Sequence, residues 1–309
     1  MAFIATRKSF GETLLELGGI DKNIVVLDAD LSASTMSKMF AAEYPERFFE
    51  MGIQEANMIG VGAGLALAGK KPFICSFACF VTGRYDTIRI SVAYSEAPVR
   101  IVGTHAGIAI GEDGNSQMGL EDIGLMRGLP HMHVLQPADD IETRGAVRWM
   151  AENDVPSYIR LTRQNVKDVN GPDYTFEFGK AVELVSGGDI TIMASGGTVG
   201  FAVDAAKLLK NDGINAAVAN VHTIKPLDAE AVMKYAETTG HIVTVEDHNI
   251  IGGLGTAVAE VLAEAGTGRL TRHGVKNTFG ESGKPAELYR KYRFDTEGIA
   301  SVVKEAIKK

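Results

Sequence analysis

Short apolar runs alternate with helical stretches along the first half of the chain. The runs predict strands at residues 24–28, 72–77, 99–104, 132–135 and 157–161, and helices fit between them at about 9–18, 55–68, 82–95 and 139–152. Alternation of strands with helices is typical of a parallel sheet that has helices on its faces. The pattern therefore predicts a doubly wound α/β domain.

A polar segment at residues 164–178 interrupts this pattern. The segment contains Gly171 and Pro172, a composition that is typical of a linker. Further apolar runs follow at 181–185, 190–193, 216–221 and 242–245. We therefore predict two doubly wound α/β domains, the first over residues 1–168 and the second over residues 179–309.

Glu55 is the only charged residue between Glu50 and Lys70, and it begins a run that is rich in glycine and alanine. A helix that is apolar all round is typically buried, so we expect this helix to be buried. Its lone carboxylate must then find a partner or stay partly neutral. An unpaired acid in an apolar site can protonate a ring nitrogen. Alternatively, the acid simply lies in a first helical turn, where the helix dipole stabilises it.

Composition and charge exclude several classes of protein. The chain has 309 residues, of which 45% are hydrophobic and 23% charged, as in a globular protein of about two domains. Its net charge of −8 argues against nucleic acid as the main partner. We expect no membrane span and no signal peptide. The spacing of Cys75 and Cys79 is not CxxC, which favours buried thiols in a reducing cytoplasm.

The densest group of polar residues follows the predicted strand at 99–104, which is where open α/β sheets bind ligands. His105 stands at the strand end, and Asp113 lies in the glycine-rich loop that follows. A histidine at this position could donate a hydrogen bond to a substrate oxygen or transfer a proton near neutral pH. An ordinary loop histidine with a turn-forming aspartate is the alternative interpretation.

Aromatic and basic side chains lie near the ends of two other predicted strands. Phe77 and Phe80 could stack on a flat heterocycle, or they could simply belong to the core. Arg163 follows the strand at 157–161, and Arg7 lies near the N-terminus. A guanidinium can bind a phosphate through two parallel hydrogen bonds, although either arginine taken alone could be an ordinary surface residue.

Taken together, these motifs resemble transketolase, a thiamine-diphosphate enzyme. The pyrimidine-binding domain of that family is matched by residues 52–58 (Gly-Ile-Gln-Glu-Ala-Asn-Met), 76–80 (Ser-Phe-Ala-Cys-Phe), 105, 111–118 (Gly-Glu-Asp-Gly-Asn-Ser-Gln-Met) and 161–163 (Leu-Thr-Arg). Its C-terminal domain is matched by residues 222–228 (His-Thr-Ile-Lys-Pro-Leu-Asp), 245–248 (Val-Glu-Asp-His) and 282–288 (Ser-Gly-Lys-Pro-Ala-Glu-Leu). The resemblance covers essentially the whole chain, in order.

The resemblance implies that four residues contact thiamine diphosphate. Glu55 would be catalytic, because it would hydrogen-bond N1′ of the aminopyrimidine and favour the tautomer that removes a proton from the thiazolium. Phe77 would stack on the pyrimidine, and Phe80 would line the same pocket. Gln117 stands where many microbial transketolases have histidine. Glutamine can still form hydrogen bonds at that position but cannot shuttle a proton.

The resemblance also assigns five residues to the sugar substrate. His105, which would be catalytic as well, and Asp113 would bind hydroxyls near the reacting carbons. Arg7, Ser34 and Arg163 would hold the sugar phosphate, and a helix N-terminus near Ser34 could add backbone donors. The implied activity is transfer of a two-carbon ketol unit from a ketose phosphate to an aldose phosphate, in the pentose phosphate pathway or in a specialised sugar route.

One part of the family pattern is missing from this sequence. Full-length transketolases begin with a further domain that binds diphosphate through a metal ion and carries the motif Gly-Asp-Gly, which does not occur here. We therefore predict the C-terminal subunit of a split transketolase, with no metal ligands of its own. An N-terminal subunit would supply the ligands for Mg²⁺ or Ca²⁺, and the two subunits would form a dimer of heterodimers.

Other interpretations stay open. The β subunit of a 2-oxoacid dehydrogenase E1 component has the same two domains and a separate diphosphate-binding partner, but it needs no clamp for a sugar phosphate. A fragment of a deoxyxylulose-phosphate synthase is a weaker alternative, because those enzymes are normally single chains. A non-catalytic assembly subunit would have no need of an unpaired buried carboxylate. Arg7, Arg163 and the stretch from His105 to Asp113 favour transketolase.

Overall fold

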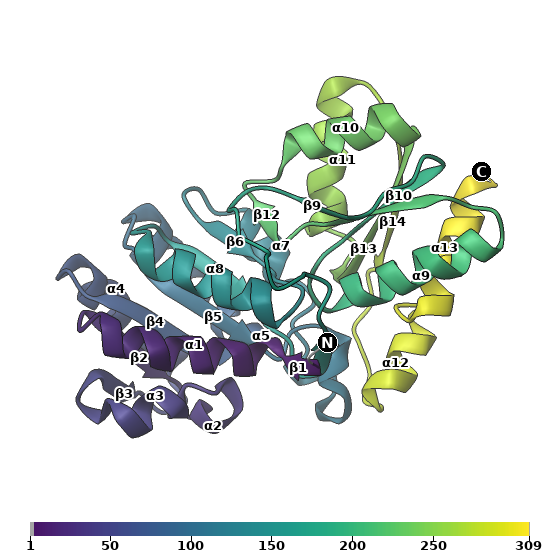
Figure 1. Ribbon diagram of the computed structural model, residues 1–309. Helices are drawn as coiled ribbons and strands as arrows, with labels where there is room; N and C mark the ends of the chain where they lie inside the picture. The colour runs from purple at the N-terminus through teal and green to yellow at the C-terminus, as the bar shows by residue number, and fades with distance from the viewer. Residues whose placement is uncertain (1–2, 309) are drawn as a thin grey trace.

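The predicted strands of the first half form one sheet, seen at the left of the computed structural model, which describes residues 3–308 (Figure 1). The strand order is β12-β6-β7-β5-β4-β2-β3. The bounds are β2 (Ile24–Asp28), β3 (Phe48–Glu50), β4 (Lys71–Phe77), β5 (Arg100–Thr104), β6 (His133–Leu135), β7 (Ser157–Arg160) and β12 (Thr223–Lys225). All pairs are parallel except that of β12 with β6, so the carboxyl ends of β2 to β7 lie at one edge.

Helices cover both faces of this sheet because successive strand residues point to opposite sides. Val26 and Phe73 pack under α1 (Thr6–Ile20) and α8 (Asp140–Glu152), whereas Leu27 and Ile74 pack under α4 (Glu55–Leu67) and η2 (Ile88–Tyr94). The remaining short elements are α2 (Ser32–Thr35), α3 (Lys38–Glu43), η1 (Pro45–Arg47), α5 (Ala78–Thr82), α6 (Tyr85–Thr87), η3 (Ile108–Asp113), η4 (Asn115–Gln117) and α7 (Asp122–Arg127).

The second domain repeats this architecture with five strands in the order β14-β13-β10-β11-β9. They are β9 (Val182–Val185), which is antiparallel, β10 (Ile190–Ala194), β11 (Ala216–Asn220), β13 (His241–Asn249) and β14 (Arg269–Val275). One face carries α9 (Val199–Asn211) and α13 (Thr296–Ile307), and the other carries α10 (Ala229–Thr239) and α11 (Leu254–Ala265). Two short helices complete it, η5 (Gly196–Thr198) and α12 (Pro285–Lys291). The prediction of an α/β protein built from parallel-sheet domains is therefore confirmed.

Two local predictions differ from the structure, and one strand pairing was not predicted at all. The helix expected at 82–95 is broken into α5, α6 and the π-helix η2, with Gly83 after α5. The polar segment 164–178 contains a short strand, β8 (Asn165–Lys167), which pairs with β1 (Phe3–Ala5). Furthermore, β12 comes from the second half of the sequence but extends the first sheet, so the two domains share a sheet edge.

The prediction that the helix at 55–68 is buried is wrong for this chain. One face of α4 packs on the sheet through Met58, Ile59 and Ala63, but the opposite face is exposed and still apolar. Val61 and Leu67 lie on that exposed face.

Within residues 3–308, no helix combines the length and the apolar character needed to cross a bilayer.

Candidate active site

The residues predicted for the site gather at the carboxyl edge of the first sheet. Five neighbouring parallel strands, β7, β5, β4, β2 and β3, end there. The predicted residues follow these strand ends: Ser34 after β2, Glu55 after β3, Phe77 and Phe80 at the end of β4, His105 and Asp113 after β5, and Arg163 after β7. Arg7 reaches the same edge from the first turn of α1.

Glu55 is the first residue of α4, and its side chain is buried although the helix exposes its next turn. The hydroxyl of Ser76 donates a hydrogen bond to Oε1 at 3.4 Å. In the described part of the chain the carboxylate forms no ion pair with any lysine, arginine or histidine. Because an ionised carboxylate can accept about four hydrogen bonds, Glu55 keeps the capacity to bind a further donor.

Three stacked rings lie at the end of β4, next in sequence to Ser76. Phe77 follows Ser76 in β4, and its buried ring is nearly parallel to that of Phe80, with centroids 5.6 Å apart and 9° between the planes. The ring of His105 stacks against Phe77 at 3.9 Å with an angle of 22°. Such an arrangement offers an apolar face to a planar ring, with a hydrogen-bond acceptor nearby.

His105 is held in one tautomer by its two neighbours. Its Nε2 lies 3.2 Å from Nη1 of Arg7, and its Nδ1 lies 2.9 Å from Oγ1 of Thr104. Arg7 has only protons to offer, so Nε2 accepts and Nδ1–H donates to Thr104. Burial, with smaller contributions from the charges of Arg7 and Arg163, lowers the pKa of His105 to about 3. In this state the ring is neutral at pH 7.

The backbone at His105 is also strained. Its φ of +59° lies in the left-handed region, which is uncommon for residues other than glycine. Strain of this kind costs on the order of 1–3 kcal/mol and is often found at functional sites. It turns the chain sharply at the end of β5, so that the imidazole lies between Phe77 and Arg7.

Two arginines provide positive charge at this edge. Nη1 of Arg7 donates to the backbone oxygen of Ser34 at 2.7 Å, and Nη1 of Arg163 donates to that of Ile110 at 2.6 Å. Arg163 also lies 3.7 Å from the carboxylate of Glu112. Burial and the charge of Arg163 lower the pKa of Arg7, and the buried Nε of Arg7 has no hydrogen-bond partner among the described residues. An anion bound between the two guanidinium groups would reduce their mutual repulsion and could accept a hydrogen bond from the unpartnered Nε of Arg7.

In the described chain, no hydrogen bond or ion pair joins Asp113 or Gln117 to the other predicted residues, whereas Ser34 contacts Arg7 through its backbone oxygen. Asp113 is exposed at the end of η3, and its carboxylate binds no other described residue. Gln117 is half-buried, and its backbone oxygen accepts a hydrogen bond from the thiol of Cys79 at 3.2 Å, which places it beside α5. Ser34 lies in α2, a helix of one turn that is too short to have a strong dipole.

Asp28 is a site residue that the sequence analysis missed. It ends β2 and is buried, and it accepts hydrogen bonds from Leu31 N, Thr35 Oγ1 and Ser37 Oγ at 2.7, 2.7 and 2.8 Å. Burial raises its pKa to about 6. These bonds fix the turn that carries Ser34. A carboxylate at the last position of an apolar strand is the signal that could have identified it.

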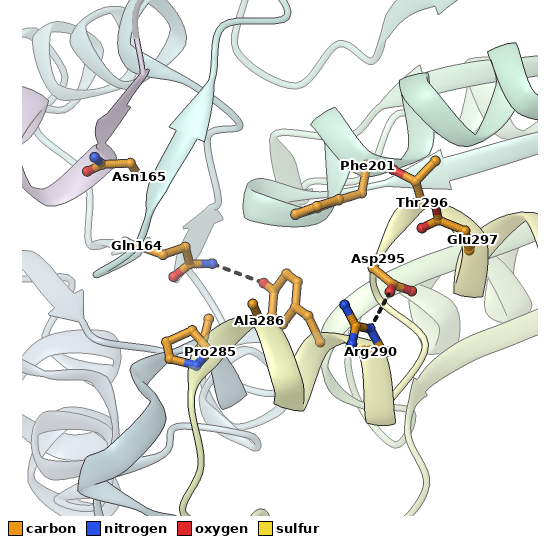
Figure 2. A pocket seen from close by; sticks show the side chains of 11 residues that line it. Gln164, Asn165, Phe201, Pro285, Ala286, Arg290, Asp295, Thr296 and Glu297 are labelled. Carbon is orange, nitrogen blue, oxygen red and sulfur yellow. Dashed lines mark hydrogen bonds and ion pairs between the residues drawn. The ribbon is translucent and has the colours of Figure 1, made fainter.

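A cavity of about 390 Å³ opens between the two domains, but it is not this site. Figure 2 shows a mixed lining, with Phe201, Pro285 and Ala286 beside polar residues such as Asn165 and Arg290. Gln164 donates a hydrogen bond of 3.0 Å to the hydroxyl of Tyr289. None of the predicted site residues lines it. In the described residues, no three His, Cys, Asp or Glu side chains are arranged to hold a metal ion.

Comparison with known proteins agrees with this geometry. Residues 2–169 match the family model of the transketolase pyrimidine-binding domain, and residues 179–299 match that of the transketolase C-terminal domain. A chain from Methanocaldococcus jannaschii, provisionally named a transketolase C-terminal section, is 48% identical over 98% of this chain and 96% of its own length. A 6-deoxy-6-sulfo-D-fructose transketolase subunit from a Clostridium species is 42% identical, over 97% and 93%.

A solved structure supports the same assignment. The structure described as "Split gene transketolase, inactive beta4 tetramer" superposes with a TM-score of 0.92 at 45% identity, over 99% of both chains. The family models together span both sheets and the site edge described above. The chain therefore belongs to the transketolase family and contains its pyrimidine-binding and C-terminal domains.

Proposed function

We propose that this chain is one subunit of a two-subunit transketolase, which transfers a two-carbon ketol unit from a ketose phosphate to an aldose phosphate. The observation that supports this most strongly is the buried carboxylate of Glu55, which has no charged partner in the described chain and accepts its hydrogen bond from Ser76, the residue before Phe77 in β4. The arginines at the same edge, Arg7 and Arg163, supply charge for a phosphate.

The residues of this edge fit the pyrimidine half of thiamine diphosphate. The aromatic face of Phe77, with Phe80 beside it, suits a flat ring, and Glu55 can accept a hydrogen bond from a protonated ring nitrogen. Gln117 is proposed as a further contact from η4. When bound, thiamine diphosphate supplies the nucleophilic carbon and the electron sink for cleavage of the C–C bond. The protein holds the ring and keeps a proton at its nitrogen.

The sugar would lie across the strand ends of β5 and β7. Arg7, Ser34 and Arg163 are proposed to bind its phosphate, because the buried Nε of Arg7 lacks a partner among the described residues and the two arginine charges repel each other. His105 and Asp113 are proposed to bind its hydroxyls. His105 is neutral at pH 7, so it binds through hydrogen bonds rather than through charge.

The diphosphate and its Mg²⁺ or Ca²⁺ are proposed to be held by an N-terminal subunit. The relatives support this proposal, since the Methanocaldococcus jannaschii chain is named a transketolase C-terminal section and the Clostridium chain a transketolase subunit, and this chain covers 96% and 93% of their lengths. A face for such a partner exists beside Glu55. Exposed apolar side chains on α4 and on the neighbouring η2, namely Val61, Leu67, Ile90 and Tyr94, form what we call the α4/η2 face.

We propose that other subunits cover the α4/η2 face in a dimer of heterodimers. An apolar helix face is expensive to leave in water, and contiguous exposed apolar residues typically mark interfaces. The similar chain described as a β4 tetramer is called inactive, which supports the idea that such a chain needs a different partner.

The finer details of substrate and location are also proposals. Pentose phosphate sugars are the first substrates to test, although the similar Clostridium subunit is named for a sulfonated sugar. The two cysteines are free, which suits a cytoplasmic enzyme. We retain 1–168 and 179–309 as domain bounds. The relatives favour transketolase over an E1 β subunit or a non-catalytic assembly subunit.

Reconstitution tests the proposal. The chain is expressed alone and together with a candidate N-terminal subunit, and each preparation receives thiamine diphosphate, Mg²⁺, a ketose phosphate and an aldose acceptor. We expect ketol transfer from the pair and none from the chain alone. Robust turnover by the chain alone would exclude the two-subunit proposal, and absence of transfer from a stable complex that binds the cofactor would exclude transketolase activity.

A further inference from the structure

None of the predicted site residues lies in the second domain. One side chain of that domain nevertheless contacts the loop at residues 105–113, which carries His105 and Asp113. Asp247 belongs to β13 and is buried between the domains. Its Oδ1 accepts a hydrogen bond of 2.9 Å from the backbone N–H of Ile108. Ile108 begins η3, three residues after His105, and η3 ends at Asp113.

The fit between Asp247 and this loop is close. Gly107 has a φ of +83°, and a Cβ atom at this position would lie 2.2 Å from Oδ2 of Asp247. Only glycine therefore allows the loop to approach the carboxylate. The loop backbone at Gly107 and Ile108 is thus in contact with one carboxylate of the other domain, immediately after the strained His105.

Asp247 is itself fixed from two further directions. The hydroxyl of Tyr289, in α12, donates to Oδ2 at 3.0 Å, and Gln164 donates to that hydroxyl (Figure 2). Nη2 of Arg160 donates to the backbone oxygen of Asp247 at 2.9 Å. Because both domains contribute these donors, the carboxylate has little freedom to move relative to the site edge.

The same domain also contacts the middle of the loop. Gly111 has a φ of +83°, and a Cβ atom there would lie 2.9 Å from the ring of Pro285, the first residue of α12. From the first domain, Arg163 binds the backbone oxygen of Ile110. The segment between His105 and Asp113 is therefore clamped at Ile108 and again at Ile110 and Gly111.

We propose that Asp247 is a positioning residue for the sugar site, through which the second domain sets the conformation of the loop that carries His105 and Asp113. This inference rests on the proposed transketolase function for its kinetic consequence. Of the proposed cofactor residues, Glu55 belongs to α4, Phe77 to β4 and Phe80 to α5, so this hydrogen bond does not hold them. Gln117 follows the loop in η4 and is the one proposed cofactor contact close to it in sequence. Loss of Asp247 therefore affects binding of the sugar more than binding of thiamine diphosphate.

The kinetic test uses the reconstituted complex with Asp247→Ala, Asp247→Asn and Tyr289→Phe. We expect Asp247→Ala to raise the KM for the ketose phosphate roughly tenfold to hundredfold, the scale expected when a substrate-positioning group shifts by about 1 Å. Affinity for thiamine diphosphate, from cofactor titration, stays within about twofold. Asp247→Asn keeps one acceptor oxygen for Ile108 and restores part of the loss.

Glu246→Gln is the matched control. Glu246 precedes Asp247 in β13 and is also buried, but it accepts its hydrogen bonds of 2.7 and 2.9 Å from Leu254 and Gly255 in its own domain. We expect this variant to lower the melting temperature without changing KM. An equal rise of KM in Glu246→Gln would show that general damage to β13 explains the effect, and would overturn the inference.

Hydrogen exchange separates this inference from the proposed function, because it needs no activity. In the full-length chain, the amide of Ile108 should exchange faster in Asp247→Ala than in wild type and Glu246→Gln. Unchanged exchange over residues 105–113 in a folded Asp247→Ala chain overturns the inference, whatever the enzyme does. If that variant does not fold, the KM for the ketose phosphate and the exchange rate of the Ile108 amide are measured in Tyr289→Phe instead, which removes one hydrogen-bond donor to Asp247.

Discussion

The two domains have the same architecture, but the carboxyl edges of their sheets are used differently. At the edge of the second sheet, Ser195 after β10 donates to Gln136, Asn220 of β11 donates to Glu142, and Asp247 of β13 accepts from Ile108. All three partners belong to the first domain. The carboxyl edge of the second sheet is therefore in contact with the first domain.

The carboxyl edge of the first sheet carries polar groups that lack hydrogen-bond partners within the described chain. Glu55 has one hydrogen bond of 3.4 Å, the buried Nε of Arg7 has no partner among residues 3–308, and Asp113 is exposed. Ligands of open α/β sheets bind at this edge in general, but the position alone does not distinguish the two domains. What distinguishes them is whether the neighbouring domain already occupies the strand ends.

The largest expected effect concerns the carboxylate of the first edge. Glu55→Gln should lower kcat of the reconstituted complex by about 10²–10⁴, the range for loss of an acid or base group. Circular dichroism and the melting temperature should stay close to those of wild type, since within residues 3–308 Glu55 has one hydrogen-bond partner, Ser76. Retention of most of the wild-type kcat would exclude Glu55 as the partner of the ring nitrogen and would remove the contrast between the two edges.

The second prediction concerns the phosphate. Arg163→Ala should raise KM for a ketose phosphate by about 10- to 100-fold, because a charged hydrogen bond contributes about 1.5–3 kcal/mol. Initial rates with the corresponding unphosphorylated ketose serve as the comparison and should change much less. Equal losses with both sugars would remove Arg163 from the phosphate site.

The third prediction concerns the α4/η2 face. Ile90→Asp should weaken association with the other subunits at least about tenfold, because it places a charge in an apolar interface. Ile20→Asp is its matched control, since Ile20 is also an exposed isoleucine but ends α1, which covers the opposite face of the sheet. Analytical ultracentrifugation of both variants measures the effect. Similar weakening in both would indicate that the α4/η2 face is not the interface.

The fourth prediction sharpens the description of the second edge. Glu142 accepts from Asn220, and its burial raises its pKa to about 7. The folded state therefore holds a proton that the unfolded state releases near pH 4.5, so the contribution of Glu142 to stability falls as pH rises from about 5 to 8. Relative to Glu142→Gln, wild type should lose on the order of 3 kcal/mol across this range, as measured by urea unfolding. A constant difference between the two proteins would contradict the raised pKa.

Much of the fold could be predicted from local pattern. Runs such as 24–28 and 190–193 are mostly apolar, as buried parallel strands are, and the segments between the runs are long enough for helices. Part of the site edge followed from the same pattern, since Phe77 ends a predicted strand and His105 stands immediately after another. Strand ends are local features, and a single sequence shows them.

Other features depend on contacts between distant segments. The exposure of α4 could not be predicted, because its composition is the same whether a sheet or another subunit covers it. The pairing of β12 with β6 and the contact of Asp247 with Ile108 join residues that are far apart in sequence. Thr104 fixes the tautomer of His105, but in the sequence it cannot be distinguished from other strand residues, because its role depends on side-chain geometry.

Strand β12 comes from the second half of the sequence and extends the first sheet, and this pairing has a practical consequence. A chain truncated before β12 would leave the edge of β6 without its antiparallel neighbour, and bare strand edges template aggregation. Protein expressed for crystallography or screening should therefore span both halves, and a chain break between them should be poorly tolerated. In the intact chain β12 covers this edge of β6.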